Sequence, residues 1–209
     1  MAGSVADDGH FGPRNLGRRA GVLLDRDGTI IVDHGYVGSV DRVEFIAGAV
    51  EAIASFNHAG IPVAVVTNQA GVAKGKYGID DVILVHKHIS GHLAGYGAHV
   101  DLFAFCPYHP EGVVAAFARA SLDRKPAAGM ALAAQAALRL DLASSWVVGD
   151  RPEDVGLAAA VGASAAYLRP GYADAGCLGP SRPGAEQPSV WSFPTLAAAA
   201  PFILERMGT

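Results

Sequence analysis

Short hydrophobic runs alternate along this chain with longer segments in which hydrophobic residues recur every three or four positions. We expect the short runs to be buried strands and the longer segments to be amphipathic helices. The predicted strands cover residues 22–24, 62–66, 100–105, 146–148 and 165–168. The predicted helices cover residues 47–58, 80–94, 130–140, 154–161 and 194–207. Because strands that alternate with helices are typical of parallel sheets with right-handed crossovers, the pattern predicts an α/β fold, with Rossmann-like layers around a mainly parallel sheet.

Long connections and irregular stretches interrupt this alternation. Residues 29–44 form a long predicted loop directly after the first strand, where it can act as a flap. A second long connection, residues 106–126, follows the third strand, and residues 171–189 are rich in Gly, Pro and Ala and predicted to be irregular. Residues 1–19 are polar and lack the apolar core of a signal peptide. We therefore expect a flexible N-terminal tail and one domain over residues 20–209.

Composition narrows the class of protein. The chain has 209 residues, of which 51% are hydrophobic, and this suits one well-buried α/β domain. A formal net charge of −4 gives no indication of a nucleic-acid partner, and no hydrophobic run is long enough to predict a membrane span. Two cysteines, Cys106 and Cys177, are too few for a disulfide framework and fit a reducing cytoplasm. The predicted location is therefore cytoplasmic.

Two carboxylates, Asp25 and Asp27, follow the first predicted strand, and Gly28 comes directly after them. Residues two apart on a strand face the same side, so both charges are expected to point into one crevice. At about 4 Å and an effective dielectric constant of about 20, they would repel by roughly 4 kcal/mol. A divalent metal ion is the usual group that offsets such repulsion. The alternative is an acidic turn without chemistry.

Polar residues are predicted at the same sheet edge in three more places. Thr67 ends the second strand, Asp150 follows the fourth, and the cations Arg124 and Lys125 precede a helix. A hydroxyl at a turn and adjacent cations both suit the oxygens of a phosphoryl group. Asp150 can join Asp25 in holding Mg²⁺, which prefers oxygen ligands. Each pattern alone also fits a polar turn or a solvated surface. Only their combination indicates a site for a phosphoryl group.

These motifs, taken in order, resemble those of the haloacid dehalogenase (HAD) phosphatase superfamily. Within it, residues 25–37 (DRDGTIIVDHGYV), 66–75 (VTNQAGVAKG) and 106–112 (CPYHPEG) are similar to the D-glycero-D-manno-heptose 1,7-bisphosphate 7-phosphatase family and its histidinol-phosphatase relatives. The resemblance extends from about residue 22 to about residue 168. It implies a HAD-like fold with a minimal cap and, by analogy, a monomer.

The resemblance implies a Mg²⁺-dependent phosphatase that works through an aspartyl-phosphate. Asp25 is implied as the nucleophile, and Asp27 as the group that protonates the leaving alkoxide and then activates water. Thr67 and Lys125 are implied to hold phosphoryl oxygens. The implied metal ligands are Asp25, the backbone carbonyl of Asp27, and Asp150. The implied substrate-binding residues are Asp33, His34, Gly35, Tyr36, Asn68, Gln69, Arg124 and Arg151.

The implied substrate is a small sugar phosphate, a heptose 1,7-bisphosphate that loses its C7 phosphate on the way to the heptose of cell-surface glycans. Arg124 is implied to contact the second phosphate, and Arg151 stands where the family usually has lysine. Two alternatives stay open: a phosphatase for histidinol phosphate or another small phosphomonoester, and a catalytically silent binding domain. The presence of the full implied set argues against the silent domain: Asp25, Asp27, Thr67, Lys125 and Asp150.

One departure from the family concerns a structural zinc. The family commonly holds zinc with three cysteines and one histidine in the loop after the third strand. Here the first ligand position is Cys106, but the histidine position is Tyr108, and the later cysteine positions are Ser121 and Asp123. Because one thiolate cannot form a closed tetrahedral site, we predict that this chain binds no structural zinc.

Three further patterns have structural interpretations. Residues 70–77 approach a P-loop motif, but Tyr77 stands where a Ser or Thr should reach Mg²⁺. His88 and His92 share a helix face, and since no third ligand is evident, we predict an exposed face rather than a metal site. Asp154 lies one turn into its predicted helix, where it either supports the metal ligands or favours the start of the helix.

Overall fold

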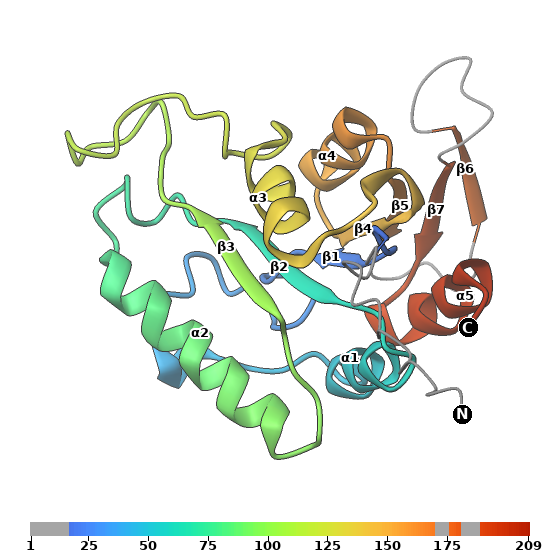
Figure 1. Ribbon diagram of the computed structural model, residues 1–209. Helices are drawn as coiled ribbons and strands as arrows, with labels where there is room; N and C mark the ends of the chain where they lie inside the picture. The colour runs from blue at the N-terminus through green and yellow to red at the C-terminus, as the bar shows by residue number, and fades with distance from the viewer. Residues whose placement is uncertain (1–16, 170–175, 181–188) are drawn as a thin grey trace, which may run out of the picture.

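The computed structural model describes residues 17–169, 176–180 and 189–209, and a sheet of seven strands runs through this part of the chain (Figure 1). The strands are β1 (Val22–Leu24), β2 (Val63–Asn68), β3 (Leu102–Cys106), β4 (Trp146–Gly149), β5 (Ser164–Leu168), β6 (Gly176–Pro180) and β7 (Ser189–Phe193). Their order in the sheet is β3-β2-β1-β4-β5-β7-β6. Neighbouring strands pair in parallel except β6, which is antiparallel to β7. The predicted mainly parallel sheet is therefore confirmed.

Helices cover both faces of the sheet and make the three layers visible in Figure 1. One face carries α1 (Ala49–His58), α2 (Ile79–Ala94) and α5 (Leu196–Met207), and the other carries α3 (Gly129–Leu138) and α4 (Pro152–Val161). Two 3-10 turns, η1 (Val40–Arg42) and η2 (Leu142–Ser144), lie in the connections. Within the described residues no helical cap domain interrupts this order. This is the three-layer HAD-like arrangement with a minimal cap.

The sheet separates two hydrophobic cores. Val22 and Leu24 belong to the core under α1, α2 and α5, whereas Leu23 belongs to the core under α3 and α4. This alternation follows from the strand period of two, and all three side chains are fully buried. A strand buried on both faces is typical of the centre of a parallel sheet. Burying each such side chain contributes about 1.5–3 kcal/mol, so the end of β1 is firmly placed.

The carboxyl ends of β1, β2, β3 and β4 meet at one edge because these strands run in parallel. Leu24 lies opposite Val65 of β2 and Val148 of β4. The N–H of Asp25 continues this pairing by donating to the carbonyl of Val148 at 2.8 Å. The residues that follow these strands are thereby brought together at this edge, as the sequence predicts.

All predicted strands and helices are present, and their ends differ from the prediction by one or two residues at most. The interpretation of residues 171–189 as irregular is wrong in part, because residues 176–180 form β6 and pair with β7, a strand that the hydrophobic pattern did not predict. β6 is the outermost strand of the sheet, and Gly and Pro are tolerated best in such an edge strand. The rest of that segment, residues 171–175 and 181–188, lies outside the described part.

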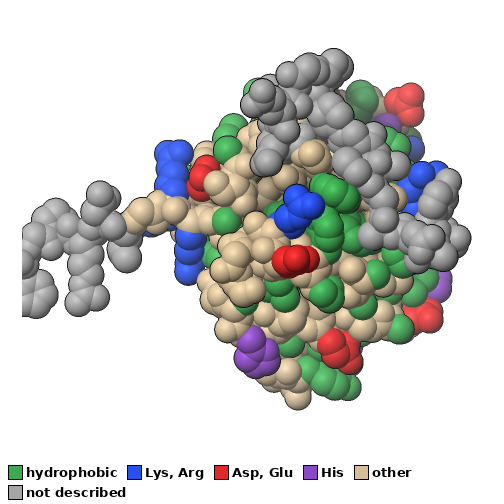
Figure 2. Space-filling model, turned by 90° about the vertical axis from the view of Figure 1, so that its right-hand side faces the viewer, with side chains coloured by type: hydrophobic (Ala, Val, Ile, Leu, Met, Phe, Trp, Pro, Cys, Tyr) green, Lys and Arg blue, Asp and Glu red, His purple; other side chains and the backbone are tan. Residues whose placement is uncertain are grey.

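The predicted flexible tail also lies mostly outside the described part, which begins at residue 17. Its last residue, Arg19, is held by backbone hydrogen bonds: its N–H donates to Arg139 at 3.2 Å and its carbonyl accepts from Asp141 at 2.8 Å. Figure 2 shows the side of the molecule that carries β6, β7 and α5, where charged side chains of the described residues lie singly or in small groups among hydrophobic and uncharged surface. The described helices include none that is long and apolar enough to cross a membrane.

Candidate active site

The chain turns sharply after β1, and this turn carries both predicted catalytic aspartates. Asp25 is buried, and its Oδ1 accepts hydrogen bonds from the N–H of Arg26 at 2.7 Å and from Lys125 Nζ at 2.9 Å. Gly28 has a φ of 79°, and a Cβ at this position would collide with the carboxylate of Asp150. Glycine is therefore required here both for the turn and for the close approach of Asp150.

Asp27 is paired with its neighbour Arg26, whose side chain is fully buried. Arg26 donates from Nε and Nη2 to both carboxylate oxygens at 2.9–3.2 Å. Burial raises the pKa of Asp27, although the Arg26 charge acts to lower it. The repulsion expected between the two aspartates is thus offset at Asp27 by Arg26 and at Asp25 by Lys125. The sequence analysis gives a divalent metal ion as the usual group for this role and does not predict the contribution of Arg26.

Lys125 is almost fully buried and bridges two carboxylates. Its Nζ lies 2.9 Å from Asp25 Oδ1 and 2.6 Å from Asp154 Oδ1. Burial acts to lower the pKa of Lys125, but Asp25 and Asp154 outweigh burial and the pKa is raised, so the ammonium form is kept. Asn68 at the end of β2 orients the Lys125 backbone by donating to its carbonyl at 3.1 Å and accepting from its N–H at 3.0 Å.

Asp154 joins this cluster to the start of α4. Its Oδ2 accepts from the N–H of Arg151 at 3.0 Å, while its Oδ1 contacts Lys125. Burial and the nearby Asp25 raise the pKa of Asp154. Asp154 therefore favours the start of the helix through one oxygen and holds Lys125 through the other, and its support of the metal ligands stays a prediction.

Three carboxylates offer a site for a divalent metal ion. One oxygen each of Asp25, Asp150 and Asp154 lie within 4.8 Å of one another. Asp150 Oδ1 is buried without a hydrogen-bond partner, and burial together with Asp25 raises the pKa of Asp150 to about 6. An unpaired buried oxygen in an acidic cluster fits Mg²⁺, which binds carboxylates and keeps several waters. Because both Asp154 oxygens are engaged by protein groups, Asp25 and Asp150 are the better placed ligands.

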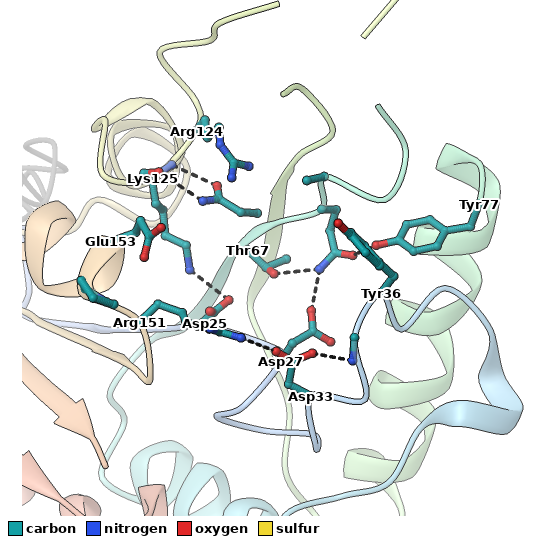
Figure 3. A pocket seen from close by; sticks show the side chains of 15 residues that line it. Asp25, Asp27, Asp33, Tyr36, Thr67, Tyr77, Arg124, Lys125, Arg151 and Glu153 are labelled. Carbon is teal, nitrogen blue, oxygen red and sulfur yellow. Dashed lines mark hydrogen bonds and ion pairs between the residues drawn. The ribbon is translucent and has the colours of Figure 1, made fainter. Parts of the chain in front are cut away.

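Asp25, Asp27 and Lys125 line a pocket of about 570 Å³ above the strand ends (Figure 3). Such a volume is typical of sites for small ligands. In Figure 3 the carboxylates of Asp25 and Asp27 and the side chains of Thr67 and Lys125 point toward one another at its base. The pocket is lined by Asp25, Asp27, Asp33, Gly35, Tyr36, Thr67, Asn68, Gln69, Ala70, Tyr77, Arg124, Lys125, Arg151, Pro152 and Glu153.

One wall of the pocket comes from residues 29–44, which we call the flap. Arg42 holds the tip of the flap, because its guanidinium donates to the carbonyls of His34, Gly35 and Tyr36 at 2.7, 3.2 and 3.1 Å. Tyr36 has a φ of 55°, which is uncommon for a residue with a side chain. The same residue lines the pocket and is 42% exposed. The strained turn therefore presents an aromatic ring at the pocket.

The flap also reaches the opposite wall of the pocket. Asp33 Oδ2 lies 2.6 Å from Nη2 of Arg151 at the start of α4. Arg124, from the loop before α3, lines the same pocket, and its Nη1 is buried without a hydrogen-bond partner. His34 alone among the predicted substrate-binding residues does not line this pocket. Its Nε2 lies 2.9 Å from Glu44 Oε2, and it faces a separate hollow.

The sequence analysis does not predict three polar or charged residues of the site: Tyr77 and Glu153 line the pocket, and the buried Arg26 pairs with Asp27. Arg26 alternates with Asp25 and Asp27 along the chain, so a strand period places it on the opposite face. The available signal was its charge, since an arginine at the end of a buried strand needs an acidic partner. Tyr77 was considered only as a mismatch to the P-loop pattern, although an aromatic residue close to a site turn is itself a candidate.

The loop after β3 is closed by contacts other than a metal site. The guanidinium of Arg119 lies 4.1 Å from the centre of the Tyr108 ring, and Tyr108 packs against Phe117. Cys106 is buried, and its Sγ lies 3.9 Å from the carbonyl of Tyr108. The later positions, Ser121 and Asp123, hydrogen-bond each other at 3.3 Å. These side chains do not fit a tetrahedral zinc site.

No cluster of metal ligands among the described residues includes the P-loop-like residues 70–77 or the pair His88 and His92. Residues 70–77 connect β2 to α2, and Tyr77 at their end donates its hydroxyl to Gln69 Oε1 at 2.7 Å. His88 is exposed as predicted, but His92 is half-buried and its ring stacks on Phe45 with centres 3.9 Å apart. The prediction of an exposed face is therefore wrong for His92, because the chain after the flap packs on this part of α2.

Comparisons with known proteins agree on one family. A family model described as HAD-hydrolase-like matches residues 122–189. The D-glycero-beta-D-manno-heptose-1,7-bisphosphate 7-phosphatase of Yersinia pestis is 41% identical over 143 residues, covering 68% of this chain and 76% of the relative. The protein of the same name from Escherichia coli (strain K12) is 38% identical over 177 residues, covering 84% of this chain and 89% of the relative.

A solved structure gives the same result. The D,D-heptose 1,7-bisphosphate phosphatase from B. bronchiseptica, complexed with magnesium and phosphate, superposes with a TM-score of 0.74 at 28% identity. The match covers 89% of this chain and 98% of that chain. Sequence identity, fold and the convergence of the predicted site residues lead to one conclusion. The chain belongs to the D-glycero-beta-D-manno-heptose-1,7-bisphosphate 7-phosphatase family of HAD-like phosphatases.

Proposed function

We propose that this chain is a Mg²⁺-dependent phosphatase that removes the C7 phosphate from D-glycero-D-manno-heptose 1,7-bisphosphate. The observation that carries the proposal is the contact of Asp25 with Lys125 at 2.9 Å, in a pocket that Asp27 and Thr67 also line. A carboxylate nucleophile, an acid–base carboxyl and a cation are the parts that an aspartyl-phosphate mechanism needs. The names of the relatives support the choice of substrate.

The reaction has two steps. In the first, a carboxylate oxygen of Asp25 attacks phosphorus, the bond from phosphorus to the sugar oxygen breaks, and Asp27 gives its proton to the leaving alkoxide. In the second, Asp27 takes a proton from water, whose oxygen attacks phosphorus and releases inorganic phosphate and free Asp25. Lys125 and the Thr67 hydroxyl hold the phosphoryl oxygens throughout. The sugar leaves as heptose 1-phosphate, so atoms and charge balance.

Asp25, the Asp27 carbonyl and Asp150 would hold Mg²⁺, which when bound neutralises charge on the transferred phosphoryl group. The buried, unpartnered Oδ1 of Asp150 supports this assignment. At the far side of the pocket, Arg124 and Arg151 offer two cations for the second phosphate of a bisphosphate. Asp33, Gly35 and Tyr36 lie where the sugar would pass between the flap and α4.

Three further features belong to this proposal. The two cysteines and the buried thiol of Cys106 support a cytoplasmic location. The minimal cap supports a monomer. Among the described residues no set of metal ligands surrounds Cys106, and Arg119 and Tyr108 close the loop by their own contact, which supports a fold that forms without structural zinc.

The experiment that tests the function measures phosphate release with Mg²⁺ from heptose 1,7-bisphosphate, histidinol phosphate and fructose 1,6-bisphosphate in parallel. Asp25→Asn serves as the blank. We expect kcat/KM for the heptose to exceed the others by at least about a hundredfold, or roughly 2.7 kcal/mol of discrimination. Comparable rates on all three substrates would keep the phosphatase chemistry and remove the heptose assignment. Full activity of Asp25→Asn would overturn the aspartyl-phosphate mechanism.

A further inference from the structure

The amide of Gln69 has every hydrogen-bonding position engaged. Gln69 is 1% exposed. Its Nε2 donates to Asp27 Oδ2 at 2.8 Å and to Thr67 Oγ1 at 2.9 Å. Its Oε1 accepts from Arg26 Nη2 at 2.9 Å and from the Tyr77 hydroxyl at 2.7 Å. A side-chain amide can donate two hydrogen bonds and accept two, so Gln69 uses its full capacity. It thereby connects Arg26 and Tyr77 to Asp27 and Thr67.

The chemistry of the neighbours determines which way this amide points. Arg26 only donates, and Asp27 Oδ2 accepts from the amide, so exchanging the amide nitrogen and oxygen would set donor against donor at one end and acceptor against acceptor at the other. The Tyr77 hydroxyl adds a second donor on the oxygen side. Burial raises the pKa of Tyr77 to about 12, so its proton stays in place.

The direction of the Gln69 amide has consequences at the base of the pocket. Because Thr67 Oγ1 already accepts from Gln69, the Thr67 hydroxyl proton is left for an acceptor in the pocket. The Asp27 carboxyl is held between Arg26 and Gln69, which limits its rotation. The Gln69 amide therefore lies between Tyr77 on one side and Thr67 and Asp27 on the other.

Tyr77 is itself wedged in place. A Cβ on Gly38 or on Gly71 would collide with the Tyr77 ring, so the ring packs between the flap and the loop after β2. Arg26, the other donor to Gln69, also donates to the carbonyl of Val37 at 2.8 Å. Both donors therefore contact the chain that follows the flap tip, and the amide is set by rigid neighbours.

We propose that Tyr77 is a positioning residue for phosphoryl transfer, which acts by donating its hydroxyl proton to Gln69 and so orients the amide that holds Asp27 and Thr67. This proposal rests on the proposed function, because Asp27 and Thr67 have their roles there. Tyr77 itself transfers no proton and contacts no reacting atom. Its hydroxyl is the part of the network that can be removed with the least change of shape.

The test compares Tyr77→Phe with wild type on two substrates. One is an alkyl phosphate, heptose 1,7-bisphosphate or, where wild type does not accept it, fructose 1,6-bisphosphate. The other is p-nitrophenyl phosphate, whose leaving group departs as a stable anion and needs little help from an acid. We expect kcat/KM on the alkyl phosphate to fall about tenfold, as one hydrogen bond allows. The loss on the aryl phosphate should be at least threefold smaller.

Two controls separate positioning from folding. Tyr96→Phe removes a hydroxyl from a tyrosine that is 62% exposed and does not line the pocket, and both rates should stay within twofold of wild type. Gln69→Glu keeps the shape but places an acceptor against Asp27 and Thr67, and we expect a loss of more than about a hundredfold on both substrates. In wild type, the Gln69 side-chain N–H protons should exchange slowly with solvent, and in Tyr77→Phe faster.

The outcomes are distinct. A selective loss on the alkyl phosphate, with faster exchange of the Gln69 amide, supports the proposal. Equal losses on both substrates, or rates and exchange unchanged from wild type, overturn it and leave Tyr77 as a packing residue. Failure of wild type on heptose bisphosphate affects only the proposed substrate, since the comparison is then made on fructose 1,6-bisphosphate and the exchange measurement needs no turnover.

Discussion

Gly28 is the residue on which the approach of Asp150 to the turn after β1 depends. Its backbone has a φ of 79°, and the lack of a side chain leaves space for the Asp150 carboxylate. A side chain at this φ costs about 1–2 kcal/mol wherever it occurs. At Gly28 a side chain would also collide with a proposed metal ligand. An experiment can therefore separate the cost of backbone strain from the loss of activity.

We expect Gly28→Ala to lower kcat/KM at least about a hundredfold, equivalent to roughly 2.7 kcal/mol, because the Cβ displaces Asp150. The matched control is Gly60→Ala. Gly60 has a φ of 70° but open space around its missing Cβ, and it precedes β2 at the opposite edge of the sheet. Both variants should lose similar stability in thermal unfolding, and only Gly28→Ala should lose activity. Wild-type activity in Gly28→Ala would refute the close-approach argument.

Asn68 gives a second prediction for a single side chain. Its two hydrogen bonds to the Lys125 backbone align the lysine that contacts Asp25. We expect Asn68→Ala to lower kcat/KM about tenfold and the free energy of unfolding by about 1–2 kcal/mol. Asn57→Ala is the control, since Asn57 also accepts from a backbone N–H, that of His99 at 2.8 Å, outside the pocket. Equal activity of the two variants would show that Asn68 does not align Lys125.

Helix α2 contains a buried histidine that couples its packing to pH. His86 is 6% exposed, and its ring stacks on Phe103 of β3 with ring centres 4.6 Å apart. Burial, followed by the Arg26 charge, lowers the pKa of His86 from 6.5 to about 3. Above pH 6.5 the ring is neutral in folded and unfolded chains alike. Below it only the unfolded chain takes up the proton, so stability falls with pH down to about pH 3.

We expect His86→Leu to remove this part of the acid sensitivity. Between pH 7 and pH 5 the wild type should lose about 2 kcal/mol more free energy of unfolding than the variant. Denaturant unfolding at the two pH values measures this difference. Carboxyl groups with raised pKa values contribute equally in both proteins, so their contribution cancels. His88→Gln, at an exposed position of the same helix, should behave as wild type. An identical pH dependence of His86→Leu and wild type would contradict the assignment.

The elements that could be predicted from the sequence are those with a strong hydrophobic period. The strands from β1 to β5 were found because each is a short hydrophobic run, fully buried in β1 and β4 and partly buried in β3, and every helix because its buried face repeats. β7 was missed because its buried and half-buried residues alternate within five positions of a segment rich in Pro and Ser. β6 was missed because its partner is antiparallel and its composition is that of a turn.

At the site, the residues that the chain order places at strand ends could be predicted, since parallel strands bring them to one edge. Asp25, Thr67 and Asp150 are gathered there as expected, and Lys125 reaches Asp25 from the loop before α3. The residues that hold them could not be predicted, because their partners are far away in sequence. Gln69 and Asn68 were assigned to substrate, yet their amides bond protein groups. Hydrogen-bond partners depend on the three-dimensional fold, so a local sequence pattern does not predict them.

For the molecule as a whole, the loop after β3 decides whether zinc contributes to folding. The cation–π contact of Arg119 with Tyr108, at 4.1 Å, closes this loop beside Arg124. We expect metal analysis of the purified protein to find less than about one zinc per ten chains, since one thiolate does not form a structural site. Chelation should leave the unfolding temperature unchanged when no other divalent metal is present. One tightly held zinc per chain would show this prediction to be wrong.

Mg²⁺ should act differently, because its proposed ligands repel one another without it. Asp25, Asp150 and Asp154 place three carboxylates together, and the cations that face them are the ammonium of Lys125 and the exposed guanidinium of Arg151, whose Nε lies 3.6 Å from Asp150 Oδ2. In chelator, Asp150→Asn should therefore unfold at the same temperature as wild type or higher. With Mg²⁺ at a hundred times its dissociation constant, wild type should gain about 2.7 kcal/mol, a rise of roughly 5–10 °C.

The gain on adding Mg²⁺ should be lost in Asp150→Asn and kept in Asp80→Asn, which removes an exposed carboxylate from the start of α2. This pair of measurements separates two explanations of the acidic cluster. If the cluster is a metal site, removing one charge stabilises the protein without metal and abolishes its response to metal. If it serves only to hold Lys125, the substitution leaves the response to Mg²⁺ as it is in wild type, and the proposed metal site is wrong.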